Sequence, residues 1–182
     1  MNLYTDLATF ADDEKGYVNM VVDIPKGGSN KYEYDEESGY FKLDRVLYHQ
    51  MFYPFDYGFV PRTKALDGDA VDVCALLTYP TFPGCVIKCR VIGAMDTADE
   101  GGPDMKVIVV PVDKLDPRFA EIQSVEDLPA HTRKELLLHF KEIKKLETEK
   151  YDKVVITGFI SKDEALGAIK EAQARFQAEH HA

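Results

Sequence analysis

The chain places Asp67-Gly68-Asp69-Ala70-Val71-Asp72 at the start of an apolar run at 71–77, and this stretch most constrains the fold and the chemistry. Crowded carboxylates repel one another and lose hydration, so three at the mouth of a strand require a compensating charge. On a regular strand Asp67 and Asp69 share one face, whereas Asp72 points to the other. The sequence therefore predicts a bend at Gly68 if all three carboxylates serve one site.

Two interpretations of this cluster are open: a site for a hard divalent cation, and a solvated acidic turn. An EF-hand loop is excluded, because it needs Gly at its sixth position and Glu at its twelfth, where this chain has Asp72 and Thr78. A second acidic loop at 99–104 precedes the apolar run that begins at Lys106. Two acidic loops that each lead into a strand can converge at one barrel mouth and bind two or more Mg²⁺.

Composition limits the class of protein. The 182 residues are 45% hydrophobic and contain no linker-like stretch, which predicts a single domain over 1–182, with an N-terminal arm at 1–16 and a frayed tail at 177–182. The formal net charge of -10 argues against a nucleic-acid or membrane surface. We expect neither as a partner.

Targeting signals are not evident in the sequence. Residues 1–14 lack a basic start and an apolar centre, and no apolar run reaches the roughly 20 residues of a membrane span. The cysteine count is odd, and Cys74, Cys85 and Cys89 all lie in strand-like runs, which fits reduced thiols. We therefore expect a cytoplasmic protein.

Hydrophobic periodicity predicts short strands followed by two helices. Strands are expected at 17–24, 31–35, 40–46, 71–77, 86–94, 106–112 and 154–160, and the aromatic segment 51–66 is expected to be an ordered loop. An apolar stripe predicts a helix at 129–147. A capping box at 161–164 predicts the start of a second helix that runs through Phe176. Short strands with long loops indicate a small barrel.

Cations and phenols that can hold an anion are scattered over the first third of the chain. Lys31 and Glu33 alternate on one strand, Arg45 closes the next, and Tyr53 and Tyr57 lie in the aromatic segment. Each alone is more commonly a surface or packing residue. They indicate an anion-binding site only if the fold brings them close to the carboxylates.

Together these residues resemble the soluble family I inorganic pyrophosphatases of bacterial type, whose core signature is Asp-x-Asp-Pro-x-Asp. The similarity covers most of the chain, from about Tyr17 to about Phe159. It is carried by the segments Lys31-Tyr32-Glu33, Asp44-Arg45, Met51-Phe52-Tyr53-Pro54, Tyr57-Gly58, Asp67 to Val73, Asp99-Glu100, Asp104 and Lys106.

The resemblance implies an α+β fold that is mainly β, with a five-stranded OB-like closed barrel, flanking strands, long loops and two C-terminal helices packed on it. It implies an inorganic diphosphatase that hydrolyses pyrophosphate to two phosphates by a metal-activated water. The implied cofactor is Mg²⁺, with Mn²⁺ or Zn²⁺ as possible substitutes. The implied assembly is a cytoplasmic homohexamer.

The resemblance also implies a role for each matching residue. The implied metal ligands are Asp67, Asp72, Asp99, Asp104 and Glu33. Asp69 is the implied general base and shares the catalytic work with Tyr57, Arg45 and Lys31. The implied phosphate-binding residues are Lys31, Arg45, Tyr57, Lys106, Lys144 and Tyr53, and the implied supporting residues are Asp23, Glu100 and Lys150.

The chain departs from the family pattern at four positions. Ala70 stands in place of Pro, Asp23 in place of Glu, Asp56 in place of Asn, and Ile143 where a Tyr precedes the phosphate-binding Lys. One residue is also missing near Ile143. The phosphate role therefore falls to Lys144 or to one of its neighbours, Lys141 and Lys145.

Other functions are also open. An OB-type barrel can bind single-stranded nucleic acid, and the candidate stacking rings are Phe52, Tyr53, Phe55, Tyr57 and Phe59. The negative net charge and the carboxylates at the mouth oppose that function. A metal-binding relative without activity ranks below the enzyme. His139 is either a subunit contact or a packed helix residue.

Overall fold

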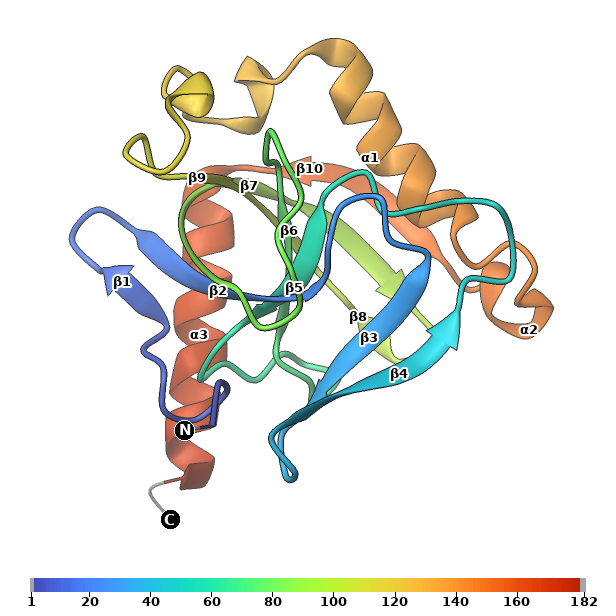
Figure 1. Ribbon diagram of the computed structural model, residues 1–182, viewed down its shortest axis with the longest axis horizontal. Coiled ribbons are helices and arrows are strands. Elements are labelled where there is room, and N and C mark those ends of the chain that lie inside the picture. Colours follow the sequence, from blue (N-terminus) through green and yellow to red (C-terminus); the bar gives the residue numbers. More distant parts are fainter. Residues whose placement is uncertain (1, 181–182) are drawn as a thin grey trace.

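A five-stranded closed barrel forms the centre of the computed structural model, which describes residues 2–180 (Figure 1). Its strands, in the order in which they pair around the barrel, are β2 (Tyr17–Ile24), β5 (Asp56–Val60), β6 (Val71–Ala75), β9 (Lys106–Pro111) and β7 (Val86–Asp99). The barrel closes because β7 pairs back with β2. The β6–β9 pair is parallel and the others are antiparallel. The predicted barrel is confirmed.

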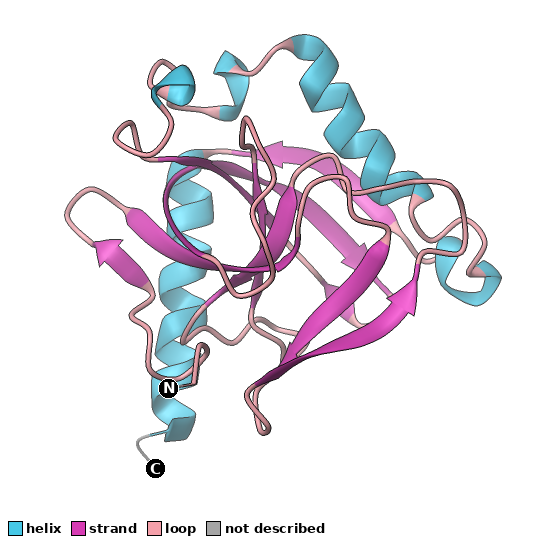
Figure 2. Cartoon of the chain, viewed as in Figure 1, coloured by secondary structure: helices cyan, strands magenta, loops and turns pink. Residues whose placement is uncertain are grey.

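Further strands lie outside the barrel. β1 (Phe10–Asp12) pairs with β2, and β8 (Gly102–Pro103) and β10 (Val155–Ile160) pair with β7. The strands β3 (Asn30–Asp35) and β4 (Tyr40–Val46) form a separate two-stranded sheet. This hairpin stands apart from the barrel ribbon (Figure 2).

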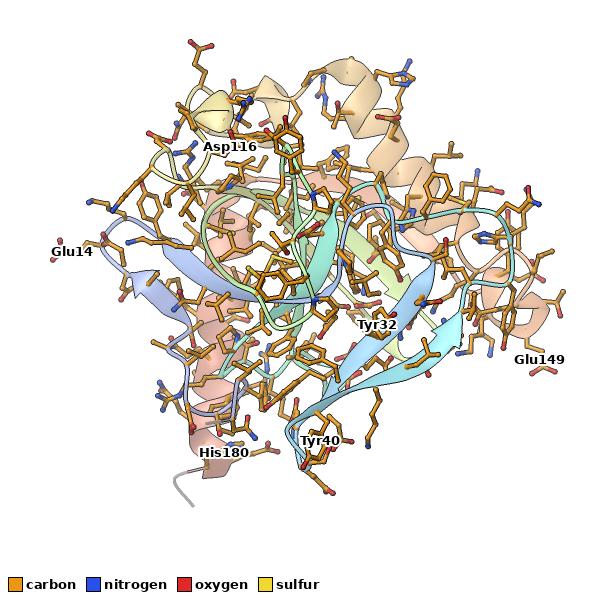
Figure 3. The ribbon with its side chains drawn as sticks, in the orientation of Figure 1. Glu14, Tyr32, Tyr40, Asp116, Glu149 and His180 are labelled. Atoms are coloured by element: carbon orange, nitrogen blue, oxygen red, sulfur yellow. The ribbon has the colours of Figure 1, made fainter. Side chains whose placement is uncertain are left out.

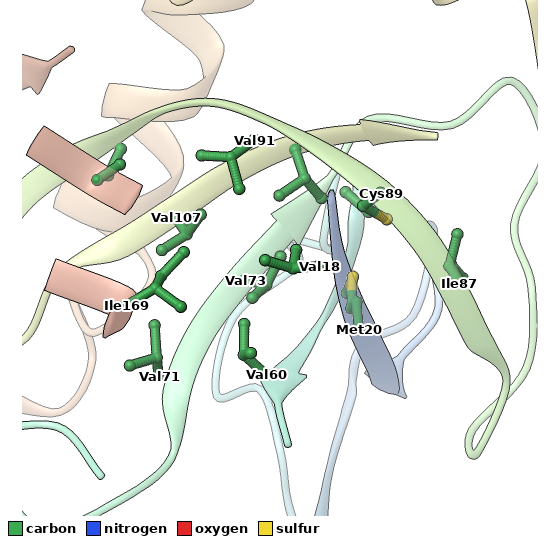
Figure 4. Packing of buried hydrophobic residues seen from close by; sticks show 14 of the residues in the cluster. Val18, Met20, Val60, Val71, Val73, Ile87, Cys89, Val91, Val107 and Ile169 are labelled. Atoms are coloured by element: carbon green, nitrogen blue, oxygen red, sulfur yellow. The ribbon is translucent and has the colours of Figure 1, made fainter. Parts of the chain in front are cut away.

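Helices cover the barrel on two sides. α1 (Ala130–Glu142) and the short α2 (Thr148–Tyr151) follow two 3₁₀ turns, η1 (Pro117–Phe119) and η2 (Val125–Asp127). α3 (Lys162–His180) contributes Ala165, Ile169 and Ala172 to the barrel core. Figure 4 shows Ile169 of α3 beside Val71 and Val107 of the barrel strands. The two predicted C-terminal helices are thus present, although the helix expected at 129–147 ends at Glu142 and a separate turn of helix follows.

The expectation that 51–66 is a loop was wrong, because this segment contains β5. All five residues of β5 are buried, so the strand shows no alternation of polar and apolar side chains. Gly58 makes the close pairing with β2 possible, since a Cβ there would lie 1.9 Å from the Val21 carbonyl oxygen. Pro54 and Pro61 lie just outside the strand, where a missing N–H does not break the ladder.

The tail expected to be frayed, 177–182, is helical as far as the structure describes it. α3 continues through His180, whose ring stacks on Phe176 with the ring centroids 3.8 Å apart. Phe176 is buried against Tyr4, so contacts with the N-terminal residues hold the end of the helix in place. The remainder of the expected tail, 181–182, lies outside the described residues.

Candidate active site

Two adjoining cavities, of about 360 Å³ and about 220 Å³, lie at the barrel mouth next to the hairpin. Four side chains line both cavities: Lys31, Tyr57, Asp69 and Asp72. The larger cavity is also lined by Arg45, Tyr53, Asp67, Asp99, Glu100, Asp104, Lys106, Lys144 and Lys150, and the smaller one by Asp23 and Glu33. The structure therefore brings all the site residues named from the sequence to one place.

The predicted bend at Gly68 is present. Gly68 has a φ of 101°, a backbone conformation that favours glycine. Asp67 Oδ1 accepts a hydrogen bond from the Asp69 N–H at 3.1 Å, which fixes the turn. As a result Asp67, Asp69 and Asp72 all line the larger cavity.

The pKa of Asp69 is raised above its ordinary value. Burial is the main cause, and the charges of Asp67 and Asp72 add to it. A carboxylate with a raised pKa is a stronger base than an exposed one.

Lys106 supplies positive charge between the two acidic loops. Its ammonium contacts the carboxylates of Asp72 and Asp104 and lies 5.8 Å from the centroid of the Tyr57 ring. Burial acts to lower the pKa of Lys106, but the two carboxylates outweigh it and raise the pKa. Burial raises the pKa of Asp104 to about 6 despite Lys106. The side chain of Lys106 thus remains charged although it is buried.

Lys144 reaches the site from the chain that follows α1. Its Nζ lies 2.7 Å from Asp99 Oδ2 and 3.0 Å from Glu100 Oε2. Burial acts to raise the pKa of Asp99, but Lys144 and the Gly101 N–H hold it below its ordinary value. Lys150 Nζ lies 3.2 Å from Glu100 Oε1.

The alternatives to Lys144 lie elsewhere. Lys141 lines a separate apolar groove between α1 and β10, and the exposed Lys145 pairs with Glu142. Ile143 lines the larger cavity and packs against the cluster that contains Phe140. Of the three lysines, Lys144 is the one that lines the site.

The hairpin supplies the remaining cations. Lys31 and Arg45 face each other across the β3–β4 ladder. Arg45 Nη2 lies 3.2 Å from Glu147 Oε1, and its buried Nε has no hydrogen-bond partner within residues 2–180. Lys31 contacts Glu33.

Two further aspartates differ in their surroundings. Burial raises the pKa of Asp23 well above its ordinary value, aided by Asp72 and Glu33, and its buried Oδ1 has no partner within residues 2–180. Asp56 is fully buried outside both cavities, and its carboxylate accepts hydrogen bonds from the backbone N–H groups of Lys26 and Thr81. Asp56 therefore fastens two loops and does not add charge to the site.

Comparison with known proteins identifies this arrangement. Residues 20–177 match the inorganic pyrophosphatase family. The chain belongs to this family. The inorganic pyrophosphatase of Geobacillus stearothermophilus is 52% identical over 134 residues, which are 74% of this chain and 80% of the relative. That of Sulfolobus acidocaldarius is 46% identical over 158 residues, which are 87% of this chain and 90% of the relative.

Solved structures of inorganic pyrophosphatases share the fold. The crystal structure from Thermus thermophilus superimposes with a TM-score of 0.90 at 40% identity, covering 97% of this chain and 99% of the other. The resemblance stated from the sequence is confirmed. No helix within residues 2–180 has both the length and the apolarity needed to span a bilayer.

The pyrophosphatase family implies a divalent metal, and the donor set suits one. Asp and Glu side chains line both cavities, and their oxygens are the ligands preferred by hard cations such as Mg²⁺. Among residues 2–180, no three His, Cys, Asp or Glu side chains already converge on a single point. Lysines instead bridge Asp72 to Asp104 and Asp99 to Glu100. A cation that binds here has to share these carboxylates with the lysines.

Sequence reasoning missed Glu147 as a neighbour of the site. It lies at the start of α2 and pairs with Arg45, 102 residues earlier in the chain. No local pattern marks it, because the chain between α1 and α2 sets its position. Thr97 was also missed, and its hydroxyl donates to the Asp104 carbonyl and ties the second acidic loop to β7.

Proposed function

We propose that this chain hydrolyses inorganic pyrophosphate to two phosphates, with Mg²⁺ as cofactor. The observation that carries the proposal is the alternation of charge in one cavity of about 360 Å³, where Lys31, Arg45, Lys106 and Lys144 lie among the carboxylates. A phosphoanhydride needs both kinds of group, cations for its oxygens and carboxylates for metal and water. Membership of the inorganic pyrophosphatase family supports the same reaction.

In this proposal the acidic residues hold the metal. Asp67, Asp72, Asp99 and Asp104 are the ligands, Glu33 touches a further ion, and Asp23 and Glu100 support them. Mn²⁺ or Zn²⁺ can substitute for Mg²⁺. When bound, such an ion neutralises phosphate charge and makes the attacking water more acidic.

Asp69 acts as the general base. Its raised pKa and its place between the two cavities suit it to take a proton from the attacking water. The turn fixed by its own N–H and Asp67 holds its backbone in position. Positioning of this kind is the main work left to the protein, because the transition state of phosphoryl transfer is loose.

Cations and phenols bind the substrate. Arg45 lines the larger cavity together with Lys31, and its guanidinium can bind a phosphate oxygen there. Burial raises the pKa of Tyr57 and of Tyr53, so both hydroxyls remain protonated and can donate. Lys31, Lys106 and Lys144 complete the set, and Lys150 lies beside them. These groups stabilise the charge that develops on the leaving phosphate.

The test is the release of phosphate from pyrophosphate at neutral pH, with millimolar Mg²⁺ and with a chelator. We expect turnover with Mg²⁺ and none with the chelator. Absence of turnover in Mg²⁺, Mn²⁺ and Zn²⁺ would contradict the proposal.

The nucleic-acid alternative is disfavoured by the burial of its stacking rings. Tyr53, Phe55, Tyr57 and Phe59 are all buried, and only Phe52 of the five candidates is exposed. Buried rings cannot stack on bases. A single-strand binding assay at low salt is expected to show no binding.

We further propose a cytoplasmic homohexamer. Exposed apolar side chains on α1 and β10, including Leu138 and Val155, support a contact between copies of the chain. His139 does not take part, because it is buried against Tyr53 and Phe55 of its own chain. Light scattering measures the assembly directly, and a monomer at micromolar concentration would contradict it.

A further inference from the structure

The two halves of the site belong to different sheets. Asp67, Asp69 and Asp72 lie at the entry to β6 of the barrel, whereas Lys31, Glu33 and Arg45 lie on the separate β3–β4 hairpin. No strand ladder within residues 2–180 joins the two sheets. The distance between the base and the hairpin cations therefore depends on contacts other than strand pairing.

Residues 2–7 contact the hairpin. The Leu3 N–H donates to the Tyr34 hydroxyl at 2.9 Å, and Asn2 Nδ2 donates to the Glu36 carbonyl at 2.8 Å. The Tyr34 ring packs on Phe41 of the hairpin and stacks on Phe59 of the barrel, with centroid distances of 5.2 and 5.7 Å. Figure 3 labels Tyr40 at the end of the hairpin and His180 at the end of α3, both at the end of the molecule where the N terminus lies.

The same residues are fastened to the barrel. The Tyr4 hydroxyl donates to the Thr63 carbonyl at 2.7 Å, and the Tyr4 carbonyl accepts from the Arg62 N–H at 2.9 Å. The Thr63 hydroxyl oxygen in turn accepts a hydrogen bond from the Val71 N–H at 3.0 Å. Val71 stands between Asp69 and Asp72, so this chain of bonds ends inside the aspartate segment.

A shared apolar cluster reinforces both attachments. It contains Tyr4, Phe59 and Phe176, with Tyr34 of the hairpin and Ala70 of the aspartate segment packed against it. Tyr34 and Asp69 also line the same small cavity. Movement of the hairpin end therefore disturbs both the cluster and the wall of the site.

We infer that residues 2–7 form a brace between the hairpin and the aspartate segment, and that Tyr34 is a positioning residue that holds Lys31 opposite Asp69. The catalytic consequence rests on the proposed function, whereas the brace itself does not. In this inference Tyr34 acts through the position of Lys31. Loss of its hydroxyl should weaken the binding of phosphate groups and leave the chemical step nearly unchanged.

The test uses Tyr34→Phe, which removes the bond from Leu3 and keeps the ring. The matched control is Tyr40→Phe on the same hairpin, because Tyr40 is exposed and its hydroxyl has no bond within residues 2–180. Hydrogen exchange of the amides in 30–46 should accelerate about three- to tenfold in Tyr34→Phe and not in the control. Asn2→Ala, which removes the bond to Glu36, should accelerate the same amides.

Kinetics separate positioning from a merely structural role. In Tyr34→Phe we expect KM for pyrophosphate to rise about three- to tenfold with kcat changed less than about twofold. In a protein that already carries Lys31→Met, Tyr34→Phe should raise KM for pyrophosphate by less than a further factor of about two, because the effect of Tyr34 passes through Lys31. Additive effects on kcat/KM would overturn the positioning role of Tyr34.

The outcomes also separate this inference from the proposed function. If the parent protein does not hydrolyse pyrophosphate, the proposed function fails, while the exchange experiment still decides the brace. If the amides of 30–46 exchange equally in Tyr34→Phe, Asn2→Ala and the parent, the brace is overturned. An unchanged KM in Tyr34→Phe, with an active parent, overturns the role of Tyr34 in substrate binding.

Discussion

Lys106 and Asp72 are direct partners across the parallel β6–β9 ladder, and the ammonium of the first contacts the carboxylate of the second. The lysine thus offsets carboxylate charge where the sequence predicts a metal. In the proposed function the Lys106 ammonium also binds phosphate, so it should favour pyrophosphate binding and oppose metal binding.

Replacement of Lys106 by Gln should therefore change metal binding and substrate binding in opposite directions. Removal of the ammonium leaves Asp72 and Asp104 uncompensated, so Mg²⁺ should bind at least as tightly as to the parent. KM for pyrophosphate should rise about ten- to a hundredfold, since a charged hydrogen bond contributes about 1.5–3 kcal/mol. Calorimetry with Mg²⁺ and steady-state kinetics measure the two effects, and weaker Mg²⁺ binding would contradict the prediction.

Asp69→Asn should lower kcat by about 10²- to 10⁴-fold, the usual contribution of a general base. The amide has the size of the carboxylate but cannot accept a proton. Asp152→Asn, at an exposed aspartate that lines neither cavity, is the matched control and should keep full activity. Unaltered turnover in Asp69→Asn would show that another residue acts as the general base.

Lys144→Gln and Lys145→Gln form a pair that tests the assignment after α1. Lys144 lines the site, whereas Lys145 is exposed and pairs with Glu142. We expect KM for pyrophosphate to rise about tenfold or more in the first variant and to stay within about twofold in the second. The reverse result would give Lys145 the phosphate role.

His139 should make stability depend on pH. Burial, followed by the nearby His49, lowers the pKa of His139 to about 3, and neither ring nitrogen has a hydrogen-bond partner within residues 2–180. The folded state therefore favours the neutral ring. The stabilisation of the folded state by the neutral His139 ring is complete above the ordinary pKa of about 6.5. It is lost progressively as the pH falls from 6.5 towards 3.

The measurement is the free energy of unfolding at pH 7 and pH 5 in the parent, His139→Phe and the exposed-site control His131→Phe. Between these pH values the parent should lose about 2 kcal/mol more than His139→Phe, at about 1.4 kcal/mol per unit below 6.5. His131→Phe should follow the parent. Parallel curves for all three proteins would show that His139 does not titrate in this way.

Two glycines should respond to alanine in opposite directions. A Cβ at Gly58 would lie 1.9 Å from the Val21 carbonyl oxygen, and backbone cannot rotate away, so Gly58→Ala should cost about 3 kcal/mol or more. Gly167 lies in α3 with no atom near its Cβ position, so Gly167→Ala should stabilise by about 0.5–1 kcal/mol. Chemical denaturation measures the free energy of unfolding of both variants. Equal changes in Gly58→Ala and Gly167→Ala would contradict the close strand pairing at Gly58.

Local signals predicted those parts of the molecule that local chemistry determines. Both acidic loops were identified from the sequence, and so was the capping box, in which Ser161 and Glu164 exchange hydrogen bonds at the start of α3. β5 was missed because both of its faces are buried, which removes the alternation that marks a strand. The pairing of Arg45 with Glu147 was missed because it depends on the path of the chain between α1 and α2.

Contacts between distant segments had no sequence signature at all. The partnership of Lys106 with Asp72 is set by the register of a parallel ladder, which an isolated strand does not specify. The contact of Leu3 with Tyr34 joins residues that only the finished fold brings together. The residue types at the site were therefore predictable, whereas the contacts that hold them were not.

The position of α3 in the core also bears on synthesis of the chain. Ala165, Ile169 and Ala172 complete a cluster whose other members come from strands made much earlier, beginning with β2. A nascent chain that lacks these residues has no partner for Val71 and Val107 on that side, and it exposes apolar strand surface while it waits. Ribosome-bound intermediates of this protein should consequently be recognised by chaperones until α3 has emerged.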